Sequence, residues 1–287
     1  MSGGPQLDER GRPRHPGHRW RNIFTIAALL LIAWAALDID VRPERLLTFP
    51  QELWTTVARM FSPPDLAYAP RALEAMIESV HMAWMGTIVG AVLSLPAGFL
   101  AARNTSPTAV VVVMRQILNI IRAVPELIWA IVIMIPIFGL GPLAGAMALG
   151  INSIGTLGKL TSEAIESIDT GPVEATRATG ASQVQMLRWG VLPQVLPEVV
   201  AFWLYRFEIN IRASAILGVL GAGGIGTLLI NLFSFRRWPE IGTTLLVIVL
   251  VTMAIDFASA AIRKRIISGL PTKATTEAAP DAAGAWG

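Results

Sequence analysis

Residues 163–197 read EAIESIDTGPVEATRATGASQVQMLRWGVLPQVLP, and the interpretation of the whole chain starts from this stretch. It is the longest polar interruption between apolar runs. Pro172 suits the first turn of a helix, and Glu174 complements the positive end of that helix's dipole. Gly180 can end the helix in a left-handed conformation. The first half of the stretch therefore predicts a short helix, and residues 163–169 are assigned to the end of the preceding apolar span.

A second short helix is predicted from Ser182 to Trp189. Ser182 and Gln185 form an S-x-x-Q capping box, in which each side chain satisfies a backbone N–H of the first turn. Pro193 and Pro197 then open the next apolar run. The sequence thus predicts a knob of two angled helices over residues 172–190, and the alternative is an ordinary structured loop.

The composition indicates a membrane protein with one main domain. Of the 287 residues, 53% are hydrophobic and only 15% are charged, against roughly 25% charged in an average soluble domain. The chain has no cysteine, which excludes disulfides, thiolate metal sites and cysteine nucleophiles. The net charge of +3 is small, and no basic face on a soluble domain points to nucleic acid.

Six apolar runs approach the ~20 residues that a helix needs to cross a bilayer. The first is preceded by five arginines (10, 12, 14, 19 and 21), which predicts a cytoplasmic N-terminus by the positive-inside rule. Six spans then place both ends in the cytoplasm and the knob on the same side. The tails 1–19 and 266–287 are expected to be disordered. The six predicted spans are 20–37, 71–102, 108–138, 143–165, 195–220 and 239–262.

Two further segments are expected at the outer face. Residues 38–70 form an external segment, in which apolar residues at helical spacing from Thr48 to Phe61 predict an amphipathic helix lying at the interface. Residues 225–235 are too short to span a bilayer and are expected to form a half-helix.

Two glycine patterns imitate nucleotide-binding motifs. GAGGIG (221–226) has the dinucleotide spacing, but it follows a membrane span rather than a strand, so close packing or a pore-facing backbone is the better interpretation. GINSIGTL (150–157) has P-loop glycines, but Thr156 and Leu157 stand where Lys and Ser/Thr are required. The sequence therefore predicts no ATP site or other cofactor on this chain. The three histidines lack metal-ligand spacing and no hydrolase signature is present, so no catalytic or metal site is predicted.

Charged residues inside the predicted spans are the candidates for a solute path. Arg122 with Glu126, and Glu208 with Arg212, are spaced i,i+4, so each pair can be neutralised on one helix face. Asn210 lies within the second pair. Structural ion pairing is one interpretation. The other is a polar path that favours an anionic solute, because the guanidinium fork matches phosphate and phosphonate oxygens.

The central stretch resembles a known motif. Glu174-Ala175, Gly180 six residues after the Glu, and Leu192-Pro193 resemble the EAA motif of binding-protein-dependent ABC importer permeases. Thr176 and Gly190 depart from the usual Ala and Ile. The resemblance covers residues 71–265 and implies an all-α membrane protein of six transmembrane helices, with a type I, methionine-permease-like (MetI-like) core after one extra N-terminal span. It also implies that Glu174, Ala175, Gly180, Ser182, Leu192 and Pro193 couple the chain to an ATPase.

Two further segments resemble the phosphonate (PhnE-type) branch of that family: RAVPELIWA (122–130) and EINIRASAILGVLGAGGIG (208–226). The resemblance implies a homodimer of permeases, two cytoplasmic ATPase subunits that carry ATP and Mg²⁺, and an external solute-binding protein in a bacterial inner membrane. Uptake of phosphonate, phosphate or phosphite is expected, with methionine or another amino acid, or a scaffold role without transport, as alternatives. Arg122, Asn210 and Arg212 are expected to line the path, with Glu126 and Glu208 orienting the arginines. Gly221, Gly223, Gly224 and Gly226 are expected at an outer gate.

Overall fold

The structure is a computed structural model that describes residues 19–38, 43–61 and 63–268, and every described element is helical or a turn. The expected tails, 1–19 and 266–287, lie almost entirely outside these residues. The chain divides into two compact units, residues 1–57 and 58–287. α1 (Arg19–Asp38) matches the first predicted span, and its apolar window is wholly exposed. α2 (Pro43–Phe61) includes the predicted amphipathic helix and begins five residues earlier than expected.

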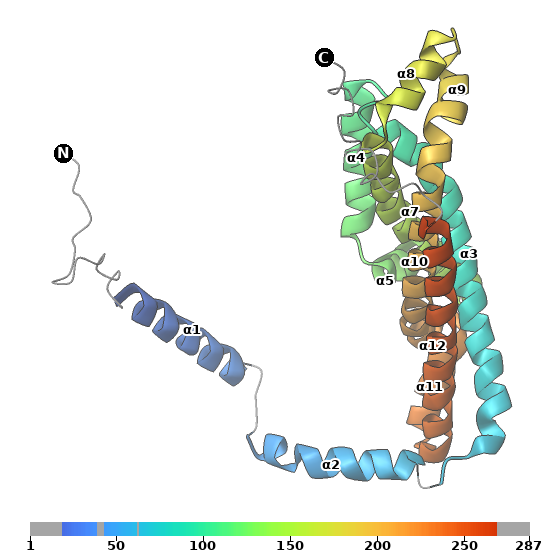
Figure 1. Ribbon diagram of the computed structural model, residues 1–287. Coiled ribbons are helices and arrows are strands. Elements are labelled where there is room, and N and C mark those ends of the chain that lie inside the picture. The colour runs from blue at the N-terminus through green and yellow to red at the C-terminus, as the bar shows by residue number, and fades with distance from the viewer. Residues whose placement is uncertain (1–18, 39–42, 62, 269–287) are drawn as a thin grey trace, which may run out of the picture. The chain divides into compact units, whose positions relative to one another are not determined.

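The second unit is a bundle of long helices with a small projection at one end (Figure 1). A single 3₁₀ turn (Leu66–Tyr68) leads into it. Its α-helices are α3 (Ala69–Ala101), α4 (Thr108–Ala123), α5 (Glu126–Trp129), α6 (Ile135–Phe138), α7 (Pro142–Glu166), α8 (Thr170–Ala178), α9 (Gln183–Met186), α10 (Leu192–Leu217), α11 (Gly224–Ser234) and α12 (Trp238–Ser268). π-helical turns occupy 130–134, 187–191 and 218–222.

α7 is the centre of the bundle, in contact with α3, α4 and α10. Glycines on α3 allow the closest of these approaches. A Cβ at Gly98 would lie 2.6 Å from a methyl of Thr161, and one at Gly90 would overlap Ser153. Each α3 glycine faces the α7 residue 63 positions later, so the two helices run parallel. Close packing through small residues is the usual way that helices associate in a membrane, where lipid is as apolar as the side chains.

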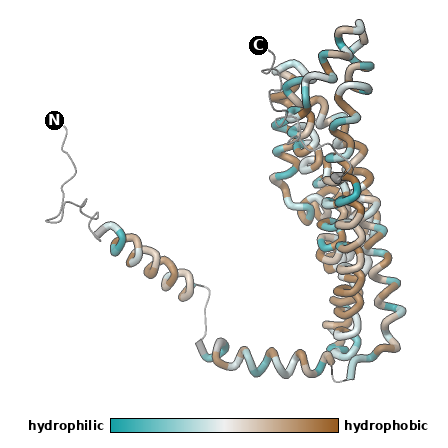
Figure 2. Tube along the Cα trace, in the orientation of Figure 1, coloured by the Kyte–Doolittle hydropathy of each residue, from teal (hydrophilic) through white to brown (hydrophobic). Residues whose placement is uncertain are grey.

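The helices account for the six predicted spans. Three of the described helices, α1, α3 and α12, are long and apolar enough to cross a membrane, and two bent pairs, 108–138 and 183–234, bring the number to five. α7 has 25 residues and coincides with the predicted span 143–165, and its glycine, serine and asparagine residues are buried within the bundle. Apolar colour covers the long helices in Figure 2, and polar colour gathers at the projection.

The span from Thr108 to Phe138 is broken at Val124 and Pro125, where its two halves bend by 88°. Proline has no N–H, so the carbonyl of Ile121 loses its helical partner. The indole N–H of Trp129 donates to that carbonyl at 3.3 Å. The amide of Asn152, on α7, donates to the carbonyl of Val124 at 3.1 Å. Side chains therefore satisfy the backbone carbonyls that the break leaves without helical partners, which stabilises the bend.

The glycine-rich stretch joins α10 to α11 through a bend of 59°. Gly221, Gly223 and Gly224 have φ of +89°, +87° and +68°, which favours glycine over residues with a Cβ. Gly226 acts differently: a Cβ there would overlap the carbonyl oxygen of Ala215. Ser79 on α3 accepts the N–H of Ile225 at 2.9 Å. In this conformation all four glycines serve the turn and its packing, and α11 is an 11-residue helix at the predicted place.

Candidate functional site

The projection is the two-helix knob expected from the sequence, here residues 170–191 (Figure 1). α8 begins two residues before the predicted start, because the side chain of Asp169 caps it by accepting the N–H of Gly171 at 2.9 Å. Gly180 has a φ of +75° and ends the first helix. The capping box of Ser182 and Gln185 is complete, with both hydrogen bonds present. Asp169 therefore belongs to the knob, and α7 already ends at Glu166.

The base of the knob is fixed to α10 by Gln194. Its amide nitrogen donates to the carbonyls of Asp169 at 3.2 Å and Gly190 at 2.6 Å, and its amide oxygen accepts the N–H of Asp169 at 3.2 Å. Gly190 lets α8 lie against the π turn, since a Cβ there would lie 3.2 Å from the Cα of Val173. The role of Gln194 was not expected from the sequence, because Asp169 lies 25 residues before it and meets it only once the chain has folded back through the knob.

The outer surface of the knob has the character of a docking face. Trp189 and Val184 are 66% and 74% exposed, although they are large and apolar. Glu174 is exposed on α8, and among the described residues its carboxylate forms no hydrogen bond or ion pair. A shallow depression between the two helices is lined by Ala175, Thr176, Thr179, Gly180, Ala181, Gln185 and Trp189. Leu192 and Pro193 lie behind it, at the start of α10.

The charged residues on α10 fall on two faces rather than one. Glu208 and Arg212 were expected to pair with each other, but both pair with α12. Arg263 donates to Glu208 at 3.2 Å, and Arg212 donates to Asp256 at 2.8 Å. A helix turns by about 100° per residue, so positions 208 and 212 share a face that lies opposite 206 and 210. The α12-facing charges are therefore matched one to one.

The opposite face of α10 carries a polar cluster within the bundle, the midbundle cluster: Arg206, Asn210, Thr87, Asn152 and Ser153. Arg206 donates from Nε to Ser153 Oγ at 2.9 Å and from Nη2 to Asn152 Oδ1 at 2.5 Å. Asn210 is completely buried and donates to Thr87 Oγ1 at 2.9 Å and Ser153 Oγ at 3.1 Å. The expected path residue Asn210 thus faces α3 and α7, with no exposure to solvent in this conformation.

Arg122 and Glu126 flank the break between α4 and α5. They do not form the within-helix pair expected from their spacing, because Pro125 ends the helix between them. Arg122 is exposed, and its backbone packs over Gly155 of α7. Glu126 begins α5, which packs against α7. The break therefore brings two of the expected residues next to the midbundle cluster, whose Asn152 holds the Val124 carbonyl.

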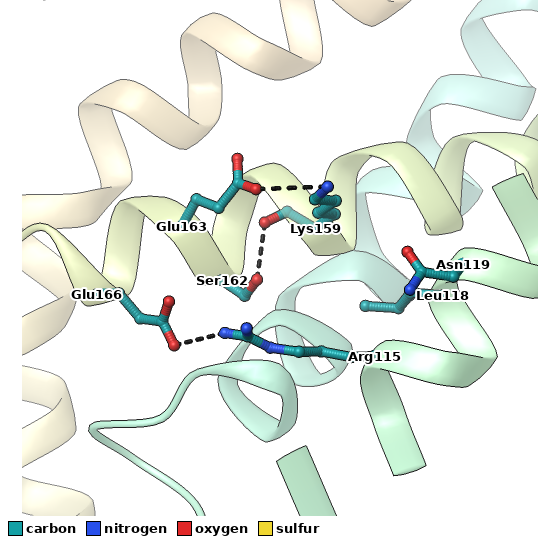
Figure 3. A pocket seen from close by; sticks show the side chains of 7 residues that line it. All are labelled: Arg115, Leu118, Asn119, Lys159, Ser162, Glu163 and Glu166. Carbon is teal, nitrogen blue, oxygen red and sulfur yellow. Dashed lines mark hydrogen bonds and ion pairs between the residues drawn. The ribbon is translucent and has the colours of Figure 1, made fainter. Parts of the chain in front are cut away.

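A small pocket of about 220 Å³ lies between α4 and α7 toward the knob end. Figure 3 shows the side chains that line it: Arg115, Leu118, Asn119, Lys159, Ser162, Glu163 and Glu166. Arg115 pairs with Glu166 at 2.6 Å and Lys159 with Glu163 at 3.7 Å. Glu166 also accepts the backbone N–H of Arg103, at 2.6 Å. The two positive and two negative side chains of the pocket balance each other. Glu166 links the loop after α3 to the helices α4 and α7.

Comparison with known proteins places this architecture. Residues 94–270 match the family model described as binding-protein-dependent transport system inner membrane component. The phosphite transport system permease protein PtxC of Stutzerimonas stutzeri is 41% identical over 250 residues, 85% of this chain and 90% of that protein.

Two other relatives match over different lengths. The phosphate-import permease protein PhnE of Mycolicibacterium smegmatis is 40% identical over 230 residues, 80% of this chain but 43% of that protein. The putative cryptic phosphonate transport system permease protein PhnE2 of Escherichia coli is 45% identical over 125 residues, 42% of this chain and 99% of that protein.

The solved structure of the MetNI methionine ABC transporter in an inward-facing conformation resembles the bundle. Its matching chain superposes with a TM-score of 0.60 and 26% identity, covering 67% of this chain and 94% of that one. The chain belongs to the family of binding-protein-dependent transport system inner membrane components, as a phosphonate-permease-like member of the type I ABC importer permeases.

Proposed function

We propose that the chain is the translocation subunit of an ATP-driven importer, which takes up a tetrahedral phosphorus oxyanion delivered by a solute-binding protein. The knob is the observation that carries this proposal. It is a capped, exposed two-helix projection at one end of an apolar bundle, and its base is fixed to α10 by Gln194. A rigid projection of this kind transmits motion of a bound partner directly to the spans.

The partner on the knob is an ATPase subunit. The exposed Trp189 and Val184 supply apolar contact area, and the unpaired carboxylate of Glu174 supplies a charged contact beside them. The chain's own P-loop-like stretch lacks the lysine, so ATP binding falls to the partner. In the proposed topology the knob and both chain ends lie in the cytoplasm, and the far end of the bundle faces the solute-binding protein, in a bacterial inner membrane.

The substrate class follows from the relatives and from chemistry. The three relatives reported above are named for phosphite, phosphate and phosphonate, which share a tetrahedral phosphorus bearing anionic oxygens. Arginine recognises such oxygens by paired, charge-assisted hydrogen bonds. The region around the break carries Arg122, Arg206 and Glu126, a net positive charge at membrane depth. This surplus of positive charge favours an anionic solute.

The path is proposed to pass the break between α4 and α5, and to open alternately to the two sides. Charges in a membrane are costly unless they are paired or face a cavity. On the α12 face of α10 they are paired, so Glu208 and Arg212 stabilise the bundle there and border the path. Around the break the charged side chains do not form ion pairs, which makes the break the favoured binding site for the solute. The four glycines at 221–226 are proposed to let α11 move at the outer end.

The functional unit is proposed to contain two permease subunits. A single bundle leaves Arg212 more than half exposed at membrane depth, which requires a protein or water neighbour rather than lipid. The Mycolicibacterium relative is more than twice as long as the aligned region, which leaves room for a second permease domain in that chain. A second copy of this chain is the simplest partner, and a related permease would satisfy the same requirement.

An amino-acid substrate is the second candidate, because the matching solved structure is a methionine transporter. Uptake by the reconstituted complex with ATPase and solute-binding protein separates the two. Radiolabelled phosphite, phosphate and methylphosphonate should be taken up and should stimulate ATP hydrolysis, and L-methionine should do neither. Methionine uptake with no oxyanion uptake would reverse the assignment. Replacing Glu174 and Gly180 together should abolish stimulated hydrolysis with normal expression, whereas unchanged hydrolysis and uptake would show that the knob does not couple the chain to an ATPase.

A further inference from the structure

Arg206 differs from the other charged residues of the bundle in the kind of partner it has. It is 8% exposed, and its hydrogen bonds go to the neutral side chains of Ser153 and Asn152. Among the described residues no carboxylate lies within ion-pair distance of its guanidinium group. Arg212, on the same helix, and Arg263, on α12, each have a carboxylate partner. A buried cation held only by neutral groups is electrostatically unsatisfied.

The position of Arg206 connects this charge to the break. Asn152 accepts from Arg206 through its amide oxygen and donates through its amide nitrogen to the Val124 carbonyl, the last residue before Pro125. A movement of α5 relative to α4 therefore acts on the same asparagine that holds the guanidinium group. Separation of Asn152 from Val124 would leave the amide free to turn, and Arg206 Nη2 free to take another acceptor.

We propose that Arg206 is the residue that binds the transported phosphorus oxyanion at the α4–α5 break, exchanging its neutral partner Asn152 for a solute oxygen. The inference rests on the proposed function and names the binding residue within it. The exchange is favourable because a hydrogen bond between two charged groups is roughly twice as strong as one to a neutral amide. An arginine already paired with a carboxylate would have to give up an equal partner, which excludes Arg212.

The exchange also accounts for the arrangement around Arg206. Ser153 Oγ holds Nε in place and is itself held by Asn210, which is held by Thr87. The Nε end of this guanidinium edge is thus fixed through three helices, while Nη2, bound by Asn152, is the donor linked to the break. Among the described residues Glu126, at the start of α5, forms no ion pair with Arg206, so it does not occupy the proposed binding position.

The test uses the full complex in proteoliposomes, with phosphite, phosphate and methylphosphonate as probes. Arg206→Gln removes the charge and should raise the KM for uptake about 10- to 100-fold, the loss of one hydrogen bond between charged groups. Arg206→Lys keeps the charge without the fork and should fall between Arg206→Gln and the wild type. Arg59→Gln, an exposed arginine on α2, is the matched control and should leave KM unchanged.

Asn152→Asp provides the second, isosteric variant. It places a permanent carboxylate against Arg206, so oxyanion uptake should be lost while the complex still assembles. If the wild-type complex carries the oxyanions and either Arg206→Gln or Asn152→Asp shows a wild-type KM, then Arg206 does not bind the solute. The proposed function is unaffected by that result. Failure of both variants to assemble assigns Arg206 to the fold and overturns the inference as well. Absence of oxyanion uptake by the wild-type complex refutes the proposed function itself.

Discussion

Gln194 binds the backbone of Asp169 through both ends of its amide: Nε2 donates to the Asp169 carbonyl and Oε1 accepts the Asp169 N–H, each at 3.2 Å. A third bond, to the Gly190 carbonyl at 2.6 Å, reaches the other end of the knob. One side chain on α10 therefore holds both the segment that enters the knob and the segment that leaves it. This is the direct mechanical connection between the proposed docking face and a span.

We predict that Gln194→Ala weakens the mechanical coupling between the ATPase subunit and the spans. The variant loses three hydrogen bonds, each contributing about 1 kcal/mol, and the knob can then move without carrying α10. Solute-stimulated ATPase activity and uptake in proteoliposomes should fall several-fold, while the ATPase subunit still copurifies. Gln183→Ala removes an exposed glutamine from α9 and serves as the control. Equal activity in the two variants would show that Gln194 does not transmit the motion.

The α3–α7 contact should be the least tolerant interface of the bundle. Gly90→Ala places a Cβ onto Ser153, and Gly98→Ala places one 2.6 Å from Thr161. Overpacking of this kind costs about 1–3 kcal/mol. Thermal unfolding of the purified permease should occur at a lower temperature in either variant. Gly171→Ala, where the nearest atom is 3.4 Å away, is the control for adding a methyl group. An unchanged midpoint in Gly90→Ala would mean that α3 and α7 lie farther apart.

The knob was predictable because its signals are local. Ser182, Gln185 and Gly180 act on backbone groups within a few residues, and the structure forms each interaction at the expected place. Gln194 was not predictable by the same reasoning. Its amide satisfies backbone groups that meet only once the chain has turned through the knob, and no spacing in the sequence indicates that meeting.

The pairings expected among the charged residues of the spans were wrong, and the errors have physical causes. Arg122 and Glu126 have i,i+4 spacing, but Pro125 ends the helix between them and the pair cannot form. Asn210 was grouped with Glu208 and Arg212, although residues two apart lie on nearly opposite faces of a helix. The same periodicity links Asn210 to Arg206, and that pairing was present in the sequence. The α12 partners of Glu208 and Arg212 depend on tertiary packing.

The Arg212–Asp256 pair should behave as a coupled unit. Removing one member leaves the other charged at membrane depth, which is more damaging than removing both. Arg212→Met and Asp256→Met should each lower the thermal midpoint of the purified permease more than the double variant does. The double-mutant cycle should give a coupling energy of about 0.5–3 kcal/mol. Additive effects of the two substitutions would show that the pair contributes nothing to stability and that Arg212 is free for the solute.

The glycines at 221–226 separate into two kinds, and substitution distinguishes them. Gly221 needs a left-handed backbone, which asparagine adopts at lower cost than alanine. Gly226 needs the absence of any Cβ, because the Ala215 carbonyl occupies that space. Gly221→Asn should therefore be nearly neutral and Gly221→Ala should cost about 1–2 kcal/mol. Gly226→Asn and Gly226→Ala should both be more damaging, as measured by thermal unfolding.

If Gly221 also acts in gating, uptake by Gly221→Ala should change by more than its lower stability explains. Uptake that follows the amount of folded complex in all four variants would assign these glycines to the turn alone.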